Sequence, residues 1–480
     1  MKCSRYMCMR LSNVTCSCRL TYTSAGYRRW IGVPRTGTVC NIGNRILSGT
    51  YFTSHVSRMA SKVGSSSKND KNFTLNAWED TATLYVHWPY CSKRCTYCNF
   101  NKYINNNVDH RRMERCLEKE IQSLTKVSGV KKIGSIFFGG GTPSLAQPQT
   151  LQRVVETAAA CALLPGDAEV SLEANPTLLE TKKIREMKQA GVNRLSVGTQ
   201  SFSHKFLKLL GREHSGEDAV RCIEEAKSVF PGKTSLDLIF GLPEQSISEW
   251  ESDLKQAINV ADNHISLYQL TLERGTALFK DIMMGHYVMP DDDVVAEMYE
   301  LAVQVLEDAG FERYEVSNFA RKNARSTHNQ AYWRGDNYIG VGPGAHGRFL
   351  VHTKEGRHRE ARIQTLEPQP WMTEVEKYGD GTRKRVIQET NDILEEILML
   401  GLRTKEGISN VHWQKFSNSS IQDIFACNED VQDFVDLGLL RLDEESLCAT
   451  SKGLNVIDSV LRVLLNSLHH NLQDQDSKHT

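Results

Sequence analysis

The chain has 480 residues, of which 40% are hydrophobic, and its 58 basic and 58 acidic residues give a formal net charge of zero. This length favours one large domain with a smaller one, and the apolar content suffices for a core. Charged residues interrupt every apolar run, so a membrane-spanning segment is not expected. No secretory signal is apparent either, which argues against a disulfide-rich extracellular protein.

The first 70 residues differ in charge from the rest of the chain. Residues 1–69 contain eleven Lys and Arg and no Asp or Glu, and Asp70 is the first acidic residue. A basic, hydroxyl-rich and acid-free leader is typical of mitochondrial transit peptides, so 1–70 is predicted to direct the protein to the mitochondrion. A disordered basic tail that binds nucleic acid is the alternative. Residues 61–79 are predicted to be a linker.

Short β-rich runs alternate with longer amphipathic runs from Thr83 onward. Because such alternation is typical of parallel strands joined by right-handed crossovers, the sequence predicts an α/β fold with a partial (β/α)6 barrel. The expected strands are Thr83–His87, Ser135–Phe138, Glu169–Leu172, Arg194–Val197, Thr234–Phe240 and His264–Leu270. The expected helices are Asp109–Lys126, Pro148–Leu163, Leu178–Ala190, Glu217–Phe230 and Ser246–Val260. Barrels of this kind carry their chemistry at the carboxyl ends of the strands.

The barrel with its extension is predicted to span residues 80–350, and a second domain to span 385–468. The stretch 355–383 between them is polar and is expected to be irregular. Apolar helical runs, a hairpin near Leu439–Thr450 and a closing helix at Ser451–Leu468 predict a small winged-helix-like α+β domain. No basic stripe marks a nucleic-acid surface, so this domain is expected to be a lid or packing module, followed by a polar tail at 469–480.

Three cysteines follow the first expected strand directly. Cys91, Cys95 and Cys98 have the spacing C-x3-C-x2-C. Thiolates are the usual ligands of iron–sulfur clusters, and three on one loop can hold three irons of a four-iron cluster and leave the fourth iron open to a small molecule. A zinc site with His87 as fourth ligand is one alternative, although the spacing lacks the two close pairs of structural zinc sites. Three unconnected thiols are the other.

A glycine run and several isolated polar residues occur near the ends of the later strands. Gly139–Thr142 ends the second strand, where glycines let a ligand approach the backbone. Glu173, Gln200 and Asp237 lie in or directly after apolar strands, where a charge is costly unless it is paired. Arg212 is a candidate partner for one of these acids or for a ligand carboxylate. Structural ion pairs remain the alternative, but a shared position at the barrel mouth favours ligand contacts.

Taken together, the motifs resemble the oxygen-independent coproporphyrinogen oxidase-like branch of the radical S-adenosylmethionine (SAM) proteins, and within it the HemW-like haem chaperones. The resemblance covers about residues 80–465. The motifs are Tyr85-x-His87-x-Pro89-x-Cys91…Cys98, Gly139-Gly140-Gly141-Thr142-Pro143, Glu173-x-Asn175-Pro176, Ser196-x-Gly198-x-Gln200-Ser201-Phe202, Leu210-Gly211-Arg212-x-His214 and Asp237-Leu238-Ile239-Phe240-Gly241-Leu242-Pro243. The resemblance implies that Cys91, Cys95 and Cys98 bind a 4Fe-4S cluster. It also implies SAM contacts from Tyr85, Gly140, Gly141, Thr142, Glu173, Gln200, Arg212 and Asp237.

One position departs from the oxidases of this branch. They carry a further cysteine two residues after the third, and this chain has Phe100 there. A phenyl ring cannot replace a thiol, so catalysis is left uncertain and a haem chaperone that delivers haem to mitochondrial acceptor proteins is favoured. The alternative is a radical SAM oxidoreductase acting on coproporphyrinogen III or another porphyrin precursor.

The run His328-Asn329-Gln330-Ala331-Tyr332-Trp333 resembles an element associated with haem in HemW-like proteins. Imidazole can ligate haem iron, and Tyr332 and Trp333 offer flat surfaces to a porphyrin. A buried, hydrogen-bonded His328 is the competing interpretation, and His346 is an alternative ligand. The expected partners are therefore haem and haem-accepting mitochondrial proteins, with no nucleic acid; a homodimer and peripheral membrane contact stay open.

Overall fold

A computed structural model describes residues 80–105, 107–321, 323–354 and 356–478, with side chains up to Asn471. The predicted leader and the predicted linker at 61–79 lie outside the described residues. In the described part of the chain, no helix combines the length and the apolar character needed to cross a membrane.

Six parallel strands form the centre of the fold and lie side by side in chain order, as the alternating sequence pattern predicts. They are β1 (Thr81–Trp88), β4 (Lys132–Gly140), β5 (Glu169–Ala174), β6 (Arg194–Gln200), β7 (Thr234–Phe240) and β8 (His264–Gln269). Their pairing is parallel at each step. The predicted partial (β/α)6 barrel is therefore confirmed.

The strands alternate between an apolar outer face and a polar inner face. Leu84, Leu172 and Leu236 belong to the large core that packs under the helices, because successive side chains of a strand point to opposite faces. Ser171 and Ser266 are buried on the other face, which lines the barrel. Tyr85 and Phe137 share this face, because they stand in register with Ser171. The barrel interior therefore combines aromatic side chains with buried polar groups that need partners.

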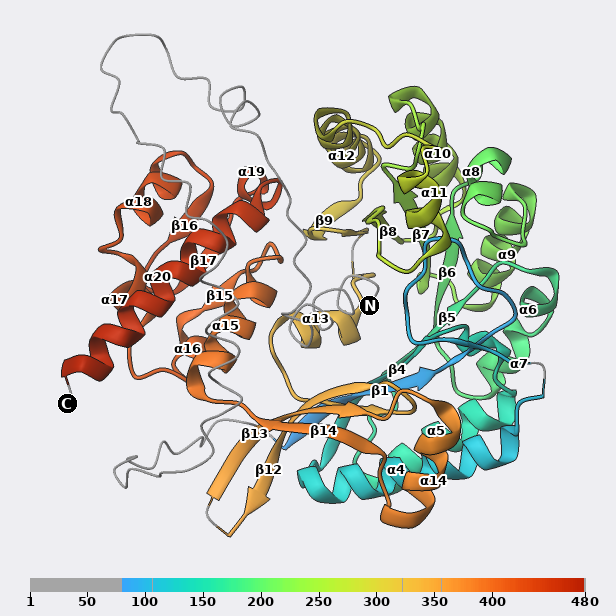
Figure 1. Cartoon of the computed structure of the whole chain (residues 1–480), viewed down its shortest axis with the longest axis horizontal. Coiled ribbons are helices and arrows are strands. Elements are labelled where there is room, and N and C mark those ends of the chain that lie inside the picture. Colours follow the sequence, from blue (N-terminus) through green and yellow to red (C-terminus); the bar gives the residue numbers. More distant parts are fainter. Residues whose placement is uncertain (1–79, 106, 322, 355, 479–480) are drawn as a thin grey trace. The chain divides into compact units, whose positions relative to one another are not determined.

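Helices cover the outer face of these strands (Figure 1). They are α4 (His110–Ser128), α5 (Pro148–Cys161), α6 (Leu178–Lys182), α7 (Ile184–Gln189), α8 (His204–Leu209), α9 (Gly216–Val229) and α10 (Ile247–Val260). Capping boxes start α9 at Ser215 and α10 at Ser246, which satisfies their first N–H groups. The predicted single helix Leu178–Ala190 is two short helices that meet at Lys183.

The sheet continues beyond both ends of the six strands. Its order is β14-β13-β12-β11-β1-β4-β5-β6-β7-β8-β10-β9. The added strands are β9 (Glu312–Glu315), β10 (Asn318–Ala320), β11 (Tyr338–Val341), β12 (His346–Thr353), β13 (Gly356–Gln364) and β14 (Thr382–Ile387). The remaining elements before the second domain are β2 (Tyr90–Cys91), β3 (Tyr103–Ile104), the 3-10 helix η1 (Pro143–Leu145), α11 (Ala277–Met283), α12 (Asp292–Asp308), α13 (Thr327–Trp333) and α14 (Pro368–Tyr378).

The prediction that 355–383 is irregular is wrong. This stretch forms β13, α14 and the start of β14, and β13 pairs along its length with β12. Its polar composition concealed a strand whose arginines are buried: Arg359 and Arg348 of β12 both pair with Glu396, at 2.9 Å each. Three buried charged side chains that neutralise one another replace the apolar face from which strands are usually recognised.

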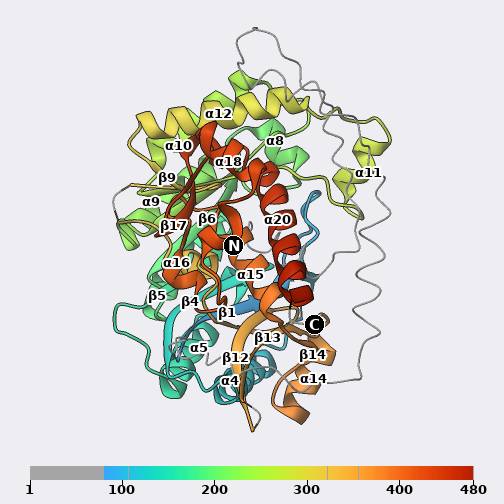
Figure 2. The ribbon, with the colours of Figure 1, turned by 90° about the vertical axis from the view of Figure 1, so that its left-hand side faces the viewer.

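The C-terminal region is a small α+β domain, as the sequence predicts (Figure 2). It contains α15 (Thr390–Gly401), β15 (Ile408–Ser409), α16 (Asn410–Trp413), α17 (Ile421–Phe425), α18 (Glu429–Asp436), β16 (Leu440–Leu442), β17 (Ser446–Ala449), α19 (Ser451–Leu454) and α20 (Ile457–Lys478). The three strands form an antiparallel sheet in the order β15-β17-β16. Trp413, Phe425 and Leu464 are fully buried in a core of its own, as the predicted winged-helix-like domain requires.

Candidate functional site

The cysteine loop leaves the carboxyl end of β1 and is held by two other parts of the chain. The N–H of Thr96 donates to the carbonyl of Leu210 at 3.2 Å, and its hydroxyl donates to the carbonyl of Leu209 at 2.7 Å. The N–H of Leu278 in α11 donates to the carbonyl of Thr96 at 2.9 Å. Backbone bonds from α8 and α11 thus fix the middle of the loop over the barrel mouth.

All three thiols of the loop are free, and they lie near one another and near polar partners. The Thr142 hydroxyl lies 3.4 Å from Cys91 Sγ, and Nη1 of Arg212 lies 3.4 Å from Cys95 Sγ. Burial raises the pKa of the Cys91 thiol to about 11; the hydrogen bond from Thr142 opposes this rise, and Cys98 and Cys95 add to it. Among the described residues, no three His, Cys, Asp or Glu side chains already converge as a metal site.

His87, the ligand proposed for a zinc site, is engaged by protein groups. It is fully buried, and its Nδ1 lies 3.2 Å from the hydroxyl of Tyr85. Its Nε2 lies 3.0 Å from the carbonyl oxygen of Asn101, at the far end of the cysteine loop. This arrangement makes His87 a support for the loop and disfavours the zinc interpretation.

The glycine run packs against the start of the cysteine loop. The N–H of Gly141 donates to the carbonyl of Trp88 at 2.7 Å, and the N–H of Thr142 to that of Tyr90 at 2.9 Å. A Cβ on Gly140 would lie 2.5 Å from the Trp88 oxygen, and one on Gly141 would lie 2.7 Å from the Tyr90 oxygen. The close approach that these glycines permit is therefore first of all to the loop backbone.

A chain of polar contacts joins the ends of β4, β5 and β6 to the cysteine loop. Nη2 of Arg212 donates to the carbonyl of Gly198 at 2.9 Å and to Oδ1 of Asn175 at 2.5 Å. Nδ2 of Asn175 donates to the Thr142 hydroxyl at 3.2 Å. The N–H of Gly140 donates to Oε2 of Glu173 at 3.3 Å. The predicted residues Gly140, Thr142, Glu173 and Arg212 are thus brought together.

Asn175 and Tyr97 belong to this constellation, although the sequence did not single them out as contacts. Asn175 links Thr142 to Arg212, and its position two residues after Glu173 at a strand end was the available signal. Tyr97 lies in the cysteine loop, where burial and the neighbouring Cys95 raise the pKa of its phenol. Local sequence cannot reveal these roles, because both depend on which strands are neighbours.

Two buried polar atoms at the mouth have no partner among the described residues: Oε1 of Gln200 and Nε of Arg212. Gln200 has a φ of 70°, where β6 leaves its regular pairing with β7. Asp237, deeper in the barrel, accepts a hydrogen bond from Ser196 at 3.1 Å. Because buried polar groups are normally paired, an acceptor and a cationic donor left over at one mouth suit a ligand with amino and carboxylate groups.

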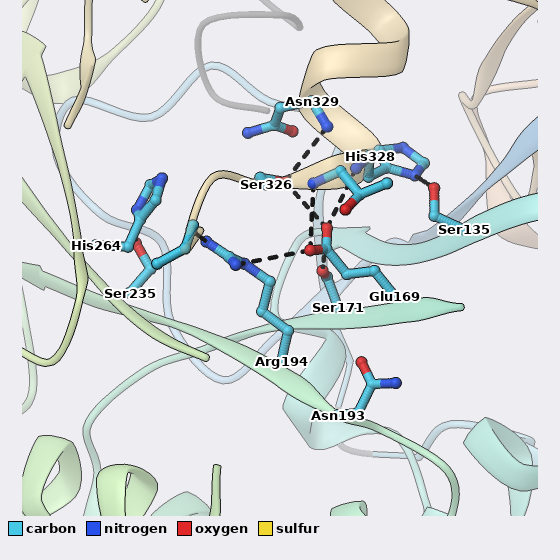
Figure 3. A network of polar contacts seen from close by, with 12 residues as sticks. Ser135, Glu169, Ser171, Asn193, Arg194, Ser235, His264, Ser326, His328 and Asn329 are labelled. Carbon is cyan, nitrogen blue, oxygen red and sulfur yellow. Dashed lines mark hydrogen bonds and ion pairs between the residues drawn. The ribbon is translucent and has the colours of Figure 1, made fainter. Parts of the chain in front are cut away.

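The predicted haem residues belong to α13, at the opposite end of the barrel. Figure 3 shows His328 there, beside Ser135 and Glu169. Nδ1 of His328 lies 2.9 Å from the hydroxyl of Ser135, near the start of β4. The N–H groups of Thr327 and His328 each donate to Glu169, the first residue of β5, at 3.2 Å. Glu169 also faces Arg194, the first residue of β6, at 3.6 Å. Helix α13 therefore closes the amino ends of the strands.

The surroundings of these residues determine the protonation of His328 and the packing of the aromatic rings. Burial lowers the pKa of His328 to about 3, so its imidazole is neutral. The ring of Tyr332 packs on that of Tyr338 at 5.1 Å, and the ring of Trp333 on that of Tyr314 at 5.7 Å. His346, the alternative ligand, is partly buried at the start of β12. His328, Tyr332 and Trp333 thus serve the packing of α13 in this structure.

Comparisons with known proteins agree with this geometry. The model of the radical SAM superfamily matches residues 85–257, and that of the HemN C-terminal domain matches residues 389–456. The fold resembles that of coproporphyrinogen III oxidase (HemN) from Escherichia coli, with a TM-score of 0.67 and 21% identity over 82% of this chain and 92% of the other. The barrel and its mouth are those of a radical SAM protein.

Comparison with individual proteins shows which radical SAM proteins are similar to this chain. The chain is 50% identical to mitochondrial radical S-adenosyl methionine domain-containing protein 1 of Bos taurus, over 82% of this chain and 89% of that protein. It is 30% identical to the heme chaperone HemW of Bacillus subtilis, over 80% of this chain and 100% of that protein. The chain belongs to the radical SAM family that contains these two proteins. The animal members are named as mitochondrial proteins, and the predicted mitochondrial location is confirmed.

Proposed function

We propose that this protein is a haem chaperone that holds a 4Fe-4S cluster and SAM at the carboxyl end of its barrel and delivers haem to mitochondrial acceptor proteins. The observation that carries the cofactor part is the contact chain from Cys91 through Thr142, Asn175 and Arg212 to Cys95. The haem part is supported by the relatives that are named heme chaperone HemW.

The roles of the residues follow from their chemistry. Cys91, Cys95 and Cys98 would hold the cluster through their thiolates. The proposed SAM contacts are Tyr85, Gly140, Gly141, Thr142, Glu173, Gln200, Arg212 and Asp237. When bound, a cluster of this kind supplies one-electron chemistry to SAM. The guanidinium of Arg212, beside Cys95, would offset thiolate charge, and its unpartnered Nε would be the donor to the carboxylate of SAM.

The haem site is proposed to lie at α13, with the motif residues His328, Tyr332 and Trp333. The second candidate function is a radical SAM oxidoreductase of porphyrin metabolism, acting on coproporphyrinogen III or another precursor. The likeness to the HemN fold favours it. Phe100, which stands where the oxidases carry a further cysteine, disfavours it.

The test uses anaerobically reconstituted full-length protein. Wild type should bind about four irons per chain and bind ferric haem, whereas replacement of Cys91, Cys95 and Cys98 by alanine should abolish the iron. Cys427→Ala is the matched control, because that thiol is exposed in the C-terminal domain. Incubation with SAM, reductant and coproporphyrinogen III separates the two functions: formation of protoporphyrinogen would establish the oxidoreductase, and absence of haem binding would refute the chaperone.

A further inference from the structure

A buried lysine ends the cysteine loop. Lys102 lies four residues after Cys98, only 9% of its surface is exposed, and its Nζ donates to the carbonyl oxygen of Cys98. Within the described part of the chain, Lys102 forms no ion pair with a carboxylate. Because lysine is almost never buried without a partner, a negatively charged group is expected beside it.

Anchors on both sides fix the position of this lysine. Before it, Nδ2 of Asn101 donates to the carbonyl oxygen of Leu366 at 2.9 Å. After it, the N–H of Tyr103 donates to the carbonyl oxygen of Pro89 at 2.8 Å, where β3 pairs with β2. The backbone of Lys102 is thus held through both of its neighbours, so the ammonium is placed at the third cysteine by the fold.

The thiolates of the proposed cluster would supply the missing negative charge. Burial raises the pKa of the Cys91 thiol, and Lys102 is one of the groups that oppose this rise. Arg212 is the second cation beside the triplet, because its Nη1 lies 3.4 Å from Cys95 Sγ. Lys102 at Cys98 and Arg212 at Cys95 therefore set two positive charges against three thiolates.

We propose that Lys102 is a counter-charge of the cluster and raises its reduction potential. The inference rests on the proposed cluster at Cys91, Cys95 and Cys98. Potentials of iron–sulfur clusters depend on net charge, hydrogen bonding and solvent exposure, and a buried cation favours the reduced, more negative cluster. Lys102 acts through the cluster and is not itself a catalytic residue. The competing interpretation is that its bond to the Cys98 carbonyl only shapes the loop, in which case a neutral donor would serve equally well.

The test is a redox titration of the reconstituted cluster in full-length wild type, Lys102→Gln and Lys102→Arg, followed by electron paramagnetic resonance. Both replacements carry N–H donors, but only arginine keeps the charge. Lys102→Gln should lower the equilibrium constant for one-electron reduction about tenfold, which makes the potential about 59 mV more negative, and Lys102→Arg should stay near wild type. Lys93→Gln is the control and should not shift the potential, because Lys93 is exposed on the same loop, where water and salt screen its charge.

A Lys102→Gln cluster with the wild-type potential would overturn the inference, and so would a Lys102→Arg cluster whose potential falls as far as that of Lys102→Gln. If Lys102→Gln holds no iron, the iron content of Lys102→Arg decides: restored iron supports the charge, and loss in both variants makes the residue structural and overturns the inference. Wild type without iron would overturn the proposed cluster and this inference together. The expected shift in a protein that binds no haem would support this inference and refute the chaperone alone.

Discussion

The ion pair between Glu169 and Arg194 offers the sharpest test of how the barrel is closed. Both side chains are 4% exposed, and Glu169 also accepts hydrogen bonds from Ser326 and from the N–H groups of Thr327 and His328. Burial alone would raise the pKa of Glu169, but Arg194 and these donors outweigh it and lower the pKa. The carboxylate is therefore charged and holds α13 against the strands.

Glu169→Gln retains the shape and removes the charge. It leaves the buried guanidinium of Arg194 uncompensated, and breaking such a pair costs about 3–5 kcal/mol. A folded unit of this size has an unfolding entropy near 0.8 kcal/mol per degree, so the melting temperature should fall by about 4–6 °C.

The assay is thermal unfolding of wild type, Glu169→Gln and the control Glu156→Gln. Glu156 pairs with Arg153 at 3.4 Å with both side chains half exposed, so its replacement should cost less than about 1 kcal/mol. In the double variant Glu169→Gln/Arg194→Gln, part of the loss should return, because no unpaired charge remains.

A Glu169→Gln variant that melts within about 1 °C of wild type, as the control should, would refute this account. The charge would then contribute nothing to closing the barrel, and α13 would be held by apolar packing alone.

Three further changes have defined outcomes. Glu396→Gln leaves Arg359 buried without its carboxylate and should lower the urea midpoint, while the circular dichroism spectrum of the folded protein stays that of wild type; an unchanged midpoint would contradict the buried pair. His214, whose pKa burial lowers to about 4, binds fewer protons in the native state than in the unfolded chain, so its contribution is complete above pH 6.5 and is lost as the pH falls toward 4. That loss is about 3 kcal/mol at most, and His214→Gln should flatten the melting temperature between pH 7 and 4.5; parallel pH profiles would refute it. Gly140→Ala, with a φ of 126° and a Cβ 2.5 Å from the Trp88 oxygen, should displace the cysteine loop and lower the iron content after reconstitution; wild-type iron content would show that the turn adapts.

The barrel could be predicted from the sequence because its signals are local. Each of the six strands has apolar side chains on its helix-facing side, and each amphipathic run follows the helical period, so the order of elements alone implies parallel strands. The spacing of Cys91, Cys95 and Cys98 directly after the first strand likewise predicts where a cofactor loop lies. These inferences need only neighbours along the chain.

The features that the sequence did not predict depend on pairing between segments that are distant along the chain. The strands of 355–383 were missed because Arg359 is neutralised by Glu396, a residue 37 positions away that no local pattern connects to it. Asn175 became part of the mouth because β5 and β6 lie next to each other. Gly140 and Gly141 proved to be required by the loop backbone that they contact.

The haem motif shows the same division most clearly. The sequence by itself determined only that His328, Tyr332 and Trp333 stand in one short run; that this run is a helix is a finding of the structure. Only the tertiary structure decided that the helix closes the barrel, that Glu169 and Ser135 hold His328 there, and that the ring of Trp333 packs on that of Tyr314. The reason is physical: local sequence governs which backbone conformation is favourable, whereas burial and charge pairing depend on segments brought together by folding.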